Sequence, residues 1–195
     1  MPTSVLPIPR VVIDLVSWQT INEFVRQCDV EINGFGLVQY DQATNTLRIS
    51  DIFVTKQTGR PGLVDVEDAD LHRHLYELLE RGVDISHINF QWHSHVNMDV
   101  YFSTTDEANI NRWTGNFLIS LVVNKRGELE CRLDIFGSQR TTHRVGLAIE
   151  WPLAGVEVQK RVRADIEKYV TKGQTKPKSF FSLGDRSWAG VGNAS

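Results

Sequence analysis

The chain has 195 residues, 41% of them apolar and 23% charged, with a formal net charge of −3 at pH 7. This length and composition are sufficient for one globular domain with a full hydrophobic core. The charge balance disfavours a nucleic-acid binder, which usually carries a basic patch or stripe. No apolar run is long enough to span a bilayer, and Met1–Val5 lacks the features of a signal peptide. We therefore expect a cytoplasmic protein with neither a membrane nor a nucleic acid as partner.

The pattern of apolar and turn-forming residues predicts the elements of the chain in order. The first half is expected to contain a strand over 10–15, a helix from Trp18 to Cys28, strands over 32–40 and 47–54, a loop over 55–65, a helix over 71–82, a strand over 86–92 and a helix over 103–113. The second half is expected to contain strands over 117–123 and 129–136 joined by a hairpin turn, a strand over 142–151 and an amphipathic helix over 158–170. Because helices and strands interleave, we expect an α/β fold around one mixed sheet.

From Thr171 the composition changes to glycine, serine, lysine and proline, which is typical of a mobile tail. Four apolar residues interrupt this tail and are candidates for docking on the domain or on a partner: Phe180, Phe181, Leu183 and Trp188. The two cysteines, Cys28 and Cys131, form no Cys-x-x-Cys pair. We expect both to be buried free thiols and not part of a disulfide framework or a cysteine-based zinc site.

Two histidines end the strand predicted over 86–92, in the sequence Trp92-His93-Ser94-His95. In an extended segment, residues i and i+2 point to the same side, so His93 and His95 can present two imidazoles to one point. Asp106 would lie in the first turn of the following helix and fold back towards them. Two histidines and one carboxylate leave one position of a tetrahedral zinc ion open for water, which is the arrangement of a catalytic site.

A catalytic zinc site also needs a general base to take a proton from the water. Glu31 is the candidate, because it stands where the chain enters the strand predicted over 32–40. Read alone, each residue has a simpler interpretation: Ser103 and Asp106 match a helix-capping pattern, and Glu31 is a carboxylate at a strand end. The constellation as a whole favours a metal site, and Ser103 is compatible with both roles.

The series Glu31…His93-x-His95, seven residues, Ser103, two residues, Asp106 resembles the JAMM motif of the MPN+ (JAB) zinc metalloproteases. The resemblance covers residues 8–170 and implies a single JAB/MPN domain of the cytidine-deaminase-like type, with a mixed central sheet flanked by helices, followed by a tail over 171–195. It implies one Zn²⁺ bound by His93, His95 and Asp106, with a water as fourth ligand. Glu31 would act as general acid–base, and Ser103 would help to stabilise the oxyanion.

The resemblance further implies a compact prokaryotic-type isopeptidase that cuts after the C-terminus of ubiquitin or a ubiquitin-like protein. An alternative is a peptidase that processes a sulfur-carrier protein or a small peptide conjugate. A non-catalytic MPN scaffold subunit is disfavoured because every motif residue is present. Members of the family commonly have proline after the second histidine, whereas this chain has Val96-Asn97, so we expect a differently shaped loop there.

Among the remaining candidates, Asp99 is the nearest rival ligand, and we expect it to be solvated. We expect His72, His74, His87 and His143 to be surface or structural residues. The basic residues of the last predicted helix are interpreted as a solvated face: Arg161, Arg163, Lys168 and Lys172.

Overall fold

The computed structural model describes residues 7–60, 63–151, 160 and 163. The chain divides into two units, residues 1–152 and 153–195, and the elements described here belong to the first. In chain order they are β1 (Arg10–Asp14), α1 (Leu15–Gln27), β2 (Asn33–Asp41), β3 (Thr46–Phe53), β4 (Gln57–Arg60), β5 (Leu63–Val66), α2 (Asp68–Glu80), the 3₁₀ turn η1 (Ile85–His87), β6 (Phe90–Ser94), α3 (Thr104–Ile110), β7 (Phe117–Val123), β8 (Leu129–Phe136), β9 (Arg140–Arg144) and β10 (Leu147–Glu150).

The expected tail over 171–195 and the domain end expected at residue 170 lie outside the described residues. So does most of the helix expected over 158–170, of which Lys160 and Arg163 have helical backbone. Within the part of the chain that is described, no helix is long and apolar enough to cross a bilayer.

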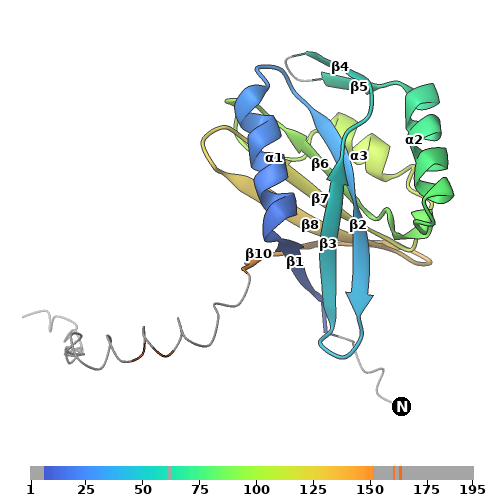
Figure 1. Ribbon diagram of the computed structural model, residues 1–195, viewed down its shortest axis with the longest axis vertical. Coiled ribbons are helices and arrows are strands. Elements are labelled where there is room, and N and C mark those ends of the chain that lie inside the picture. The colour runs from blue at the N-terminus through green and yellow to red at the C-terminus, as the bar shows by residue number, and fades with distance from the viewer. Residues whose placement is uncertain (1–6, 61–62, 152–159, 161–162, 164–195) are drawn as a thin grey trace, which may run out of the picture. The chain divides into compact units, whose positions relative to one another are not determined.

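Eight strands form one mixed sheet in the order β10-β1-β3-β2-β6-β7-β8-β9, and β4 and β5 form a separate hairpin (Figure 1). β1 runs parallel to both β10 and β3, and β6 runs parallel to β7, while the other neighbours are antiparallel. The expected α/β fold around one mixed sheet is therefore observed.

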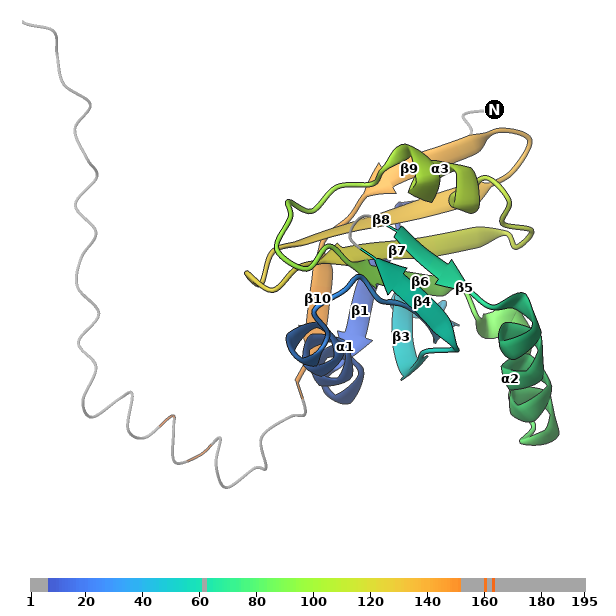
Figure 2. The same cartoon turned by 90° about the horizontal axis from the view of Figure 1, so that it is seen from above.

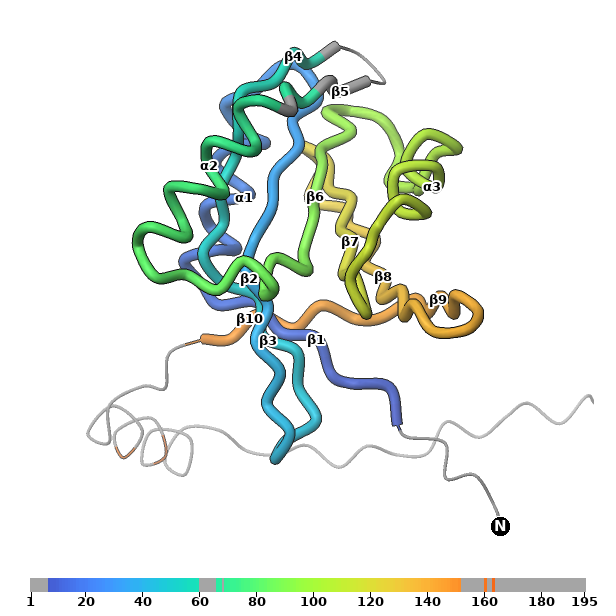
Figure 3. Tube along the Cα trace, turned by 90° about the vertical axis from the view of Figure 1, so that its right-hand side faces the viewer, coloured from blue at the N-terminus to red at the C-terminus, as the bar shows by residue number. Residues whose placement is uncertain are grey.

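The sheet is strongly curled, as the tube in Figure 3 shows. β9 and β10 lie at opposite edges of the sheet, yet only Val145 and Gly146 separate them in the chain. A linker of two residues allows at most about 11 Å between the Cα atoms of Arg144 and Leu147, so the two edges of the sheet must approach each other there. The single strand expected over 142–151 is thus wrong: the chain leaves one edge of the sheet at Arg144 and joins the other edge at Leu147.

The two faces of the sheet differ in chemistry. One face is the apolar core, to which β6 contributes Phe90 and Trp92, and α1 packs Ile21 and Val25 against it. The opposite face carries polar side chains and is covered in part by α3, which lies on the other side of the sheet from α1 (Figures 2 and 3). Strand alternation accounts for this difference, because Trp92 faces the core and His93 the polar side.

Local capping fixes where two elements begin. The side chain of Asp14 accepts hydrogen bonds from the backbone and hydroxyl of Ser17, so α1 begins at Leu15, three residues before the expected start. Asp84 caps η1 in the same way by accepting from the backbone nitrogen of Ser86 at 2.9 Å. β6 therefore begins at Phe90 and not at Ser86 as expected.

The loop expected over residues 55–65 is wrong, because this segment contains the hairpin β4–β5. Gly59 lies within β4, where its backbone contacts the segment before β2. A Cβ atom at Gly59 would lie 2.2 Å from the carbonyl oxygen of Glu31. Glycine is required here by close approach of two backbones and not by a turn.

Candidate metal centre

The end of β6 brings the two histidines of the motif together. β6 pairs with β2 on one side and β7 on the other, and the pairing continues past its end because the backbone nitrogen of His95 donates to Val123 O at 2.8 Å. His93 and His95 therefore point to the same side, with their Nε2 atoms 3.1 Å apart. Ser94 points the other way and is buried.

A hydrogen bond on the ring nitrogen of His95 that faces away from His93 fixes the orientation of the His95 ring. Its Nδ1 lies 2.7 Å from the carbonyl oxygen of Asp99. A carbonyl oxygen only accepts hydrogen bonds, so Nδ1 carries the hydrogen, and in the neutral imidazole the lone pair is then on Nε2. The ring is 4% exposed and packs edge-on against Tyr101 at 4.9 Å between centroids. This arrangement prepares Nε2 of His95 to bind a cation.

Asp106 reaches the histidines from the first turn of α3. Ser103 is the N-cap of this helix: its backbone nitrogen and hydroxyl both donate to Asp106 Oδ2 at 2.7 Å, and its hydroxyl accepts from the Asp106 backbone nitrogen. These bonds hold Oδ2 and leave Oδ1 directed at His93 Nε2, 3.6 Å away. The capping interpretation of Ser103 and Asp106 is confirmed, and it serves to aim the carboxylate.

The three side chains fit a single metal ion. One ligand atom from each of His93, His95 and Asp106 lies within 4.8 Å of the others. Two ligands about 2.05 Å from a tetrahedral zinc ion are about 3.3 Å apart, which is close to the observed separations of 3.1 and 3.6 Å. The donor set of two imidazoles and one carboxylate is one that zinc and other divalent transition metals accept.

Burial keeps His93 neutral. Desolvation lowers the pKa of His93 from the usual 6.5 to about 4, with Asp106 acting in the opposite direction and His95 adding to the decrease. Only a neutral imidazole has a lone pair to offer a metal. The environment therefore favours the form of His93 that binds a cation.

Glu31 lies 5% exposed in the wall of the same cavity, just before β2. Two sets of bonds hold the backbone around it. Ile32 exchanges hydrogen bonds with Ser94, whose backbone nitrogen donates to Ile32 O and whose hydroxyl accepts from the Ile32 nitrogen. The side chain of Gln57 accepts from the backbone nitrogen of Asn33 and donates to its carbonyl oxygen, as a neighbouring strand would.

The cavity at this centre has a volume of about 80 Å³. It is lined by Glu31, Asn33, His93, His95, Met98, Tyr101, Ser103, Thr105, Asp106 and Asn109. All five residues that the sequence assigned to the site thus share one cavity. Met98 and Tyr101 are 40% and 50% exposed and add apolar surface beside it.

The loop after His95 begins with a residue in the left-handed conformation. Val96 has a φ of +49°, which the proline ring, fixed near −65°, cannot adopt. The turn between β7 and β8 holds this loop: the Lys125 nitrogen donates to Val96 O at 2.7 Å, and the buried Asn124 side chain donates to Met98 O at 2.9 Å. The sequence around Asn124 predicts only a hairpin turn and carries no local signal for this contact with the loop.

Among the described residues, the side chains of the other candidates do not belong to the metal group, which is defined here as His93, His95 and Asp106. The Asp99 carboxylate is 86% exposed and pairs with Arg126 at 2.6 Å, so it acts on the site through its backbone carbonyl alone. His74 packs on Phe53 with ring centroids 4.5 Å apart, and the side chain of His87 is half exposed. Cys131 is buried, whereas Cys28 is partly exposed, contrary to the expectation that both are buried; neither forms a disulfide.

Comparisons with known proteins show the fold but no family. No family model matches the chain, and no curated protein matches it. Among solved structures, the chain is similar to the solution structure of protein DSY2949 from Desulfitobacterium hafniense, with a TM-score of 0.55 and 11% sequence identity. The match covers 73% of this chain and 94% of that one. At this level of identity the likeness concerns the fold alone.

Proposed function

We propose that this protein is a zinc metallopeptidase of the JAMM type, with a JAB/MPN domain as its catalytic unit. The observation that carries the proposal is the meeting of His93, His95 and Asp106 at one point, with the ligand atoms within 4.8 Å of one another. Glu31 and Ser103 line the same cavity. This is the full residue set of the JAMM motif, brought together from three separate parts of the chain.

A zinc ion held by these ligands would supply a Lewis acid that polarises a peptide carbonyl and lowers the pKa of its bound water. The chain's own residues perform the other tasks. The Glu31 carboxylate accepts the proton of the attacking water and returns it to the leaving amine. Ser103 holds Oδ2 of Asp106 with both its backbone nitrogen and its hydroxyl, so in the proposed role the hydroxyl turns from Asp106 to donate to the developing oxyanion at the cavity wall.

The proposed substrate is the C-terminal tail of ubiquitin or a ubiquitin-like protein joined to an amine. A cavity of about 80 Å³ holds only two or three water volumes, so it has room for a carbonyl group and a water beside the ligands but not for a bulky side chain, as expected if a chain of small residues such as glycine passes there. The same narrowness is compatible with the alternative substrate, a sulfur-carrier protein or a small peptide conjugate. The side chains around the metal group are mostly neutral, which suits a peptide better than a highly charged ligand.

Metal analysis is the first test. Chelator-treated protein should take up one equivalent of zinc, and His95→Ala and Asp106→Ala should lose this uptake. His87→Ala, which changes an exposed histidine outside the cavity, is the matched control and should bind zinc like the parent. A parent protein that takes up no zinc would overturn the enzyme proposal and favour a scaffold.

Cleavage is the second test. A panel of fusions to the C-termini of ubiquitin, ubiquitin-like proteins and sulfur carriers should contain a substrate that is cut with zinc and not with chelator. Glu31→Gln should bind zinc but reduce cleavage by about two to four orders of magnitude, the usual contribution of a general base. Glu23→Gln, on the exposed face of α1, is its control. A Glu31→Gln protein as active as the parent would exclude this mechanism.

A further inference from the structure

The polar face of the sheet contains buried charge beside the metal group. Arg132 and Asp134 lie two residues apart on β8, so both point to the face that α3 covers, and they are only 6% and 0% exposed. Taking charges out of water is costly, and a buried ion pair often stabilises a fold no better than apolar residues of the same volume. A contribution to stability therefore does not by itself explain this pair.

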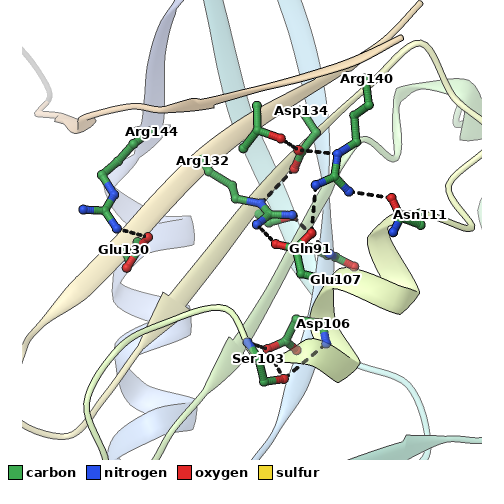
Figure 4. A network of polar contacts seen from close by, with 12 residues as sticks. Gln91, Ser103, Asp106, Glu107, Asn111, Glu130, Arg132, Asp134, Arg140 and Arg144 are labelled. Atoms are coloured by element: carbon green, nitrogen blue, oxygen red, sulfur yellow. Dashed lines mark hydrogen bonds and ion pairs between the residues drawn. The ribbon is translucent and has the colours of Figure 1, made fainter.

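Arg132 contacts α3, the helix that contains Asp106. Its Nε donates to Asp134 Oδ2 at 2.9 Å, and its Nη1 donates to Glu107 Oε1 (Figure 4). Its guanidinium carbon lies 4.3 Å from the centre of the Phe102 ring, in a cation–π contact. One guanidinium thus joins β8 to both ends of the short segment Phe102–Glu107.

That segment contains the functional residues of α3. Phe102 directly precedes Ser103, and Glu107 directly follows Asp106, so the ion pair and the ring contact of Arg132 lie on either side of the capped first turn, at residues that do not line the cavity. Arg140 on β9 adds a second bond to Glu107, from Nη2 to Oε2 at 2.8 Å. Figure 4 shows the network between β8, β9 and the start of α3.

α3 needs such an anchor because it has only seven residues. Helices this short are not stable on their own in water, so their position depends on tertiary contacts. Ile110, fully buried, anchors the far end of α3. At the other end, Arg132 and Arg140 hold the first turn of α3 through their bonds to Glu107. The two histidines come from β6, so the distance between the Asp106 carboxylate and the histidines depends on how α3 sits on the sheet.

We propose that Arg132 is a positioning residue, which holds the first turn of α3 so that Asp106 meets His93 and His95 in a geometry ready for the metal. This inference rests on the proposed metal function and assigns part of its affinity to a residue outside the ligand set. Outer-shell partners of metal ligands contribute about 10- to 100-fold to affinity. The planar guanidinium is essential, because it bonds two carboxylates and stacks on a ring at the same time.

The test uses two variants and one control in the full chain. Glu107→Gln removes the ion pair from the helix side and leaves the buried Arg132–Asp134 bond intact. Arg132→Lys keeps the positive charge but removes the planar guanidinium that bonds two carboxylates at once. Glu130→Gln breaks a more exposed ion pair between β8 and β9, in which Arg144 Nη2 bonds Glu130 Oε1 at 2.6 Å, and does not involve α3. Zinc affinity is measured by competition with a chromophoric chelator, and thermal unfolding of the metal-free protein is measured alongside.

We expect Glu107→Gln and Arg132→Lys to weaken zinc binding by about 10-fold or more, and Glu130→Gln to leave it within about 3-fold. The double variant should lose less than the sum of the two single losses, because both changes break the Arg132–Glu107 contact, although each also breaks contacts of its own. If the parent binds zinc and the two variants bind it as tightly, the inference is overturned even if their metal-free forms unfold at lower temperature. If the parent itself binds no zinc, the proposed function fails first and the inference with it.

Discussion

The carbonyl oxygen of Asp99 lies 2.7 Å from Nδ1 of His95, while the carboxylate of the same residue points away to Arg126. One residue therefore has two separate roles, and only the backbone role concerns the metal group. The carbonyl is held in place by the loop 96–99, which in turn is bonded to the turn between β7 and β8. This separation leads to the first prediction.

Asp99→Asn should leave zinc affinity and stability nearly unchanged, because exposed ion pairs contribute at most about 1 kcal/mol. Asn124→Ala should weaken zinc binding and lower the free energy of unfolding by about 1–3 kcal/mol, because it leaves buried partners without a hydrogen bond. Asn124 bonds Met98 O and Glu128, and it accepts from the backbone of Arg126. Urea unfolding and chelator competition measure the two effects. Equal losses in both variants would contradict the separate roles of the Asp99 carbonyl and carboxylate.

The stability of the metal-free protein should depend on His93 between about pH 6.5 and 4. Burial lowers the pKa of His93 to about 4, so in this window the unfolded chain binds a proton that the folded chain excludes. The contribution is fully present above pH 6.5 and is lost as the pH falls towards 4, with a total of roughly 3 kcal/mol. Chemical unfolding at a series of pH values measures it.

His93→Gln is the variant for this measurement and should flatten the dependence over the same window. His87→Gln, at an exposed position, should retain the slope of the parent. A slope that survives in His93→Gln would assign the titration to another group.

Gly59→Ala should displace Glu31, the proposed general base, without displacing the proposed metal ligands. The added Cβ would lie 2.2 Å from the carbonyl oxygen of Glu31, so the backbone that carries Glu31 must move. A misplacement of about 1 Å can cost 100-fold in rate, so we expect a fall in cleavage of that order with zinc affinity nearly unchanged. Gly146→Ala is the control, because a Cβ there has no neighbour within 4 Å. Zinc affinity that falls together with cleavage would argue against this separation.

Val96 stores strain that glycine would release. A β-branched residue at a φ of +49° is disfavoured by about 1–2 kcal/mol, whereas glycine adopts this value freely. Val96→Gly should therefore unfold at higher urea concentration than the parent, and Val96→Pro at clearly lower concentration, because the ring cannot reach this φ. A Val96→Gly protein less stable than the parent would show that side-chain packing outweighs the backbone strain.

The elements that the sequence predicted well are those with strong local patterns. The apolar runs of β7 and β8 were placed at their observed bounds, and α1 was placed within a few residues. The hairpin β4–β5 was missed because Gly59 has the same local signature whether it breaks a strand or meets another backbone. The division between β9 and β10 depends on the closure of the sheet, which involves residues far apart in the chain.

At the candidate site, the proximity of His93, His95 and Asp106 was predictable from spacing along one strand and one helix turn. The proximity of Glu31 depends on the register that places Asn33 opposite His93, a pairing of distant segments that no local pattern determines. The proposed role of Arg132 also could not be predicted from the sequence. Alternating polar residues in a strand usually indicate a solvent-facing side, and only the position of α3 shows that this side is covered.

The position of β1 has a consequence for synthesis of the chain. β1 is the first of the described strands in chain order, yet it lies inside the sheet, between β3 and the last described strand, β10. Until residues 147–150 leave the ribosome, the backbone groups of residues 11–14 on that side have no strand to pair with. Such edges are prone to pair with other chains, so we expect this protein to depend on chaperones more during translation than after release.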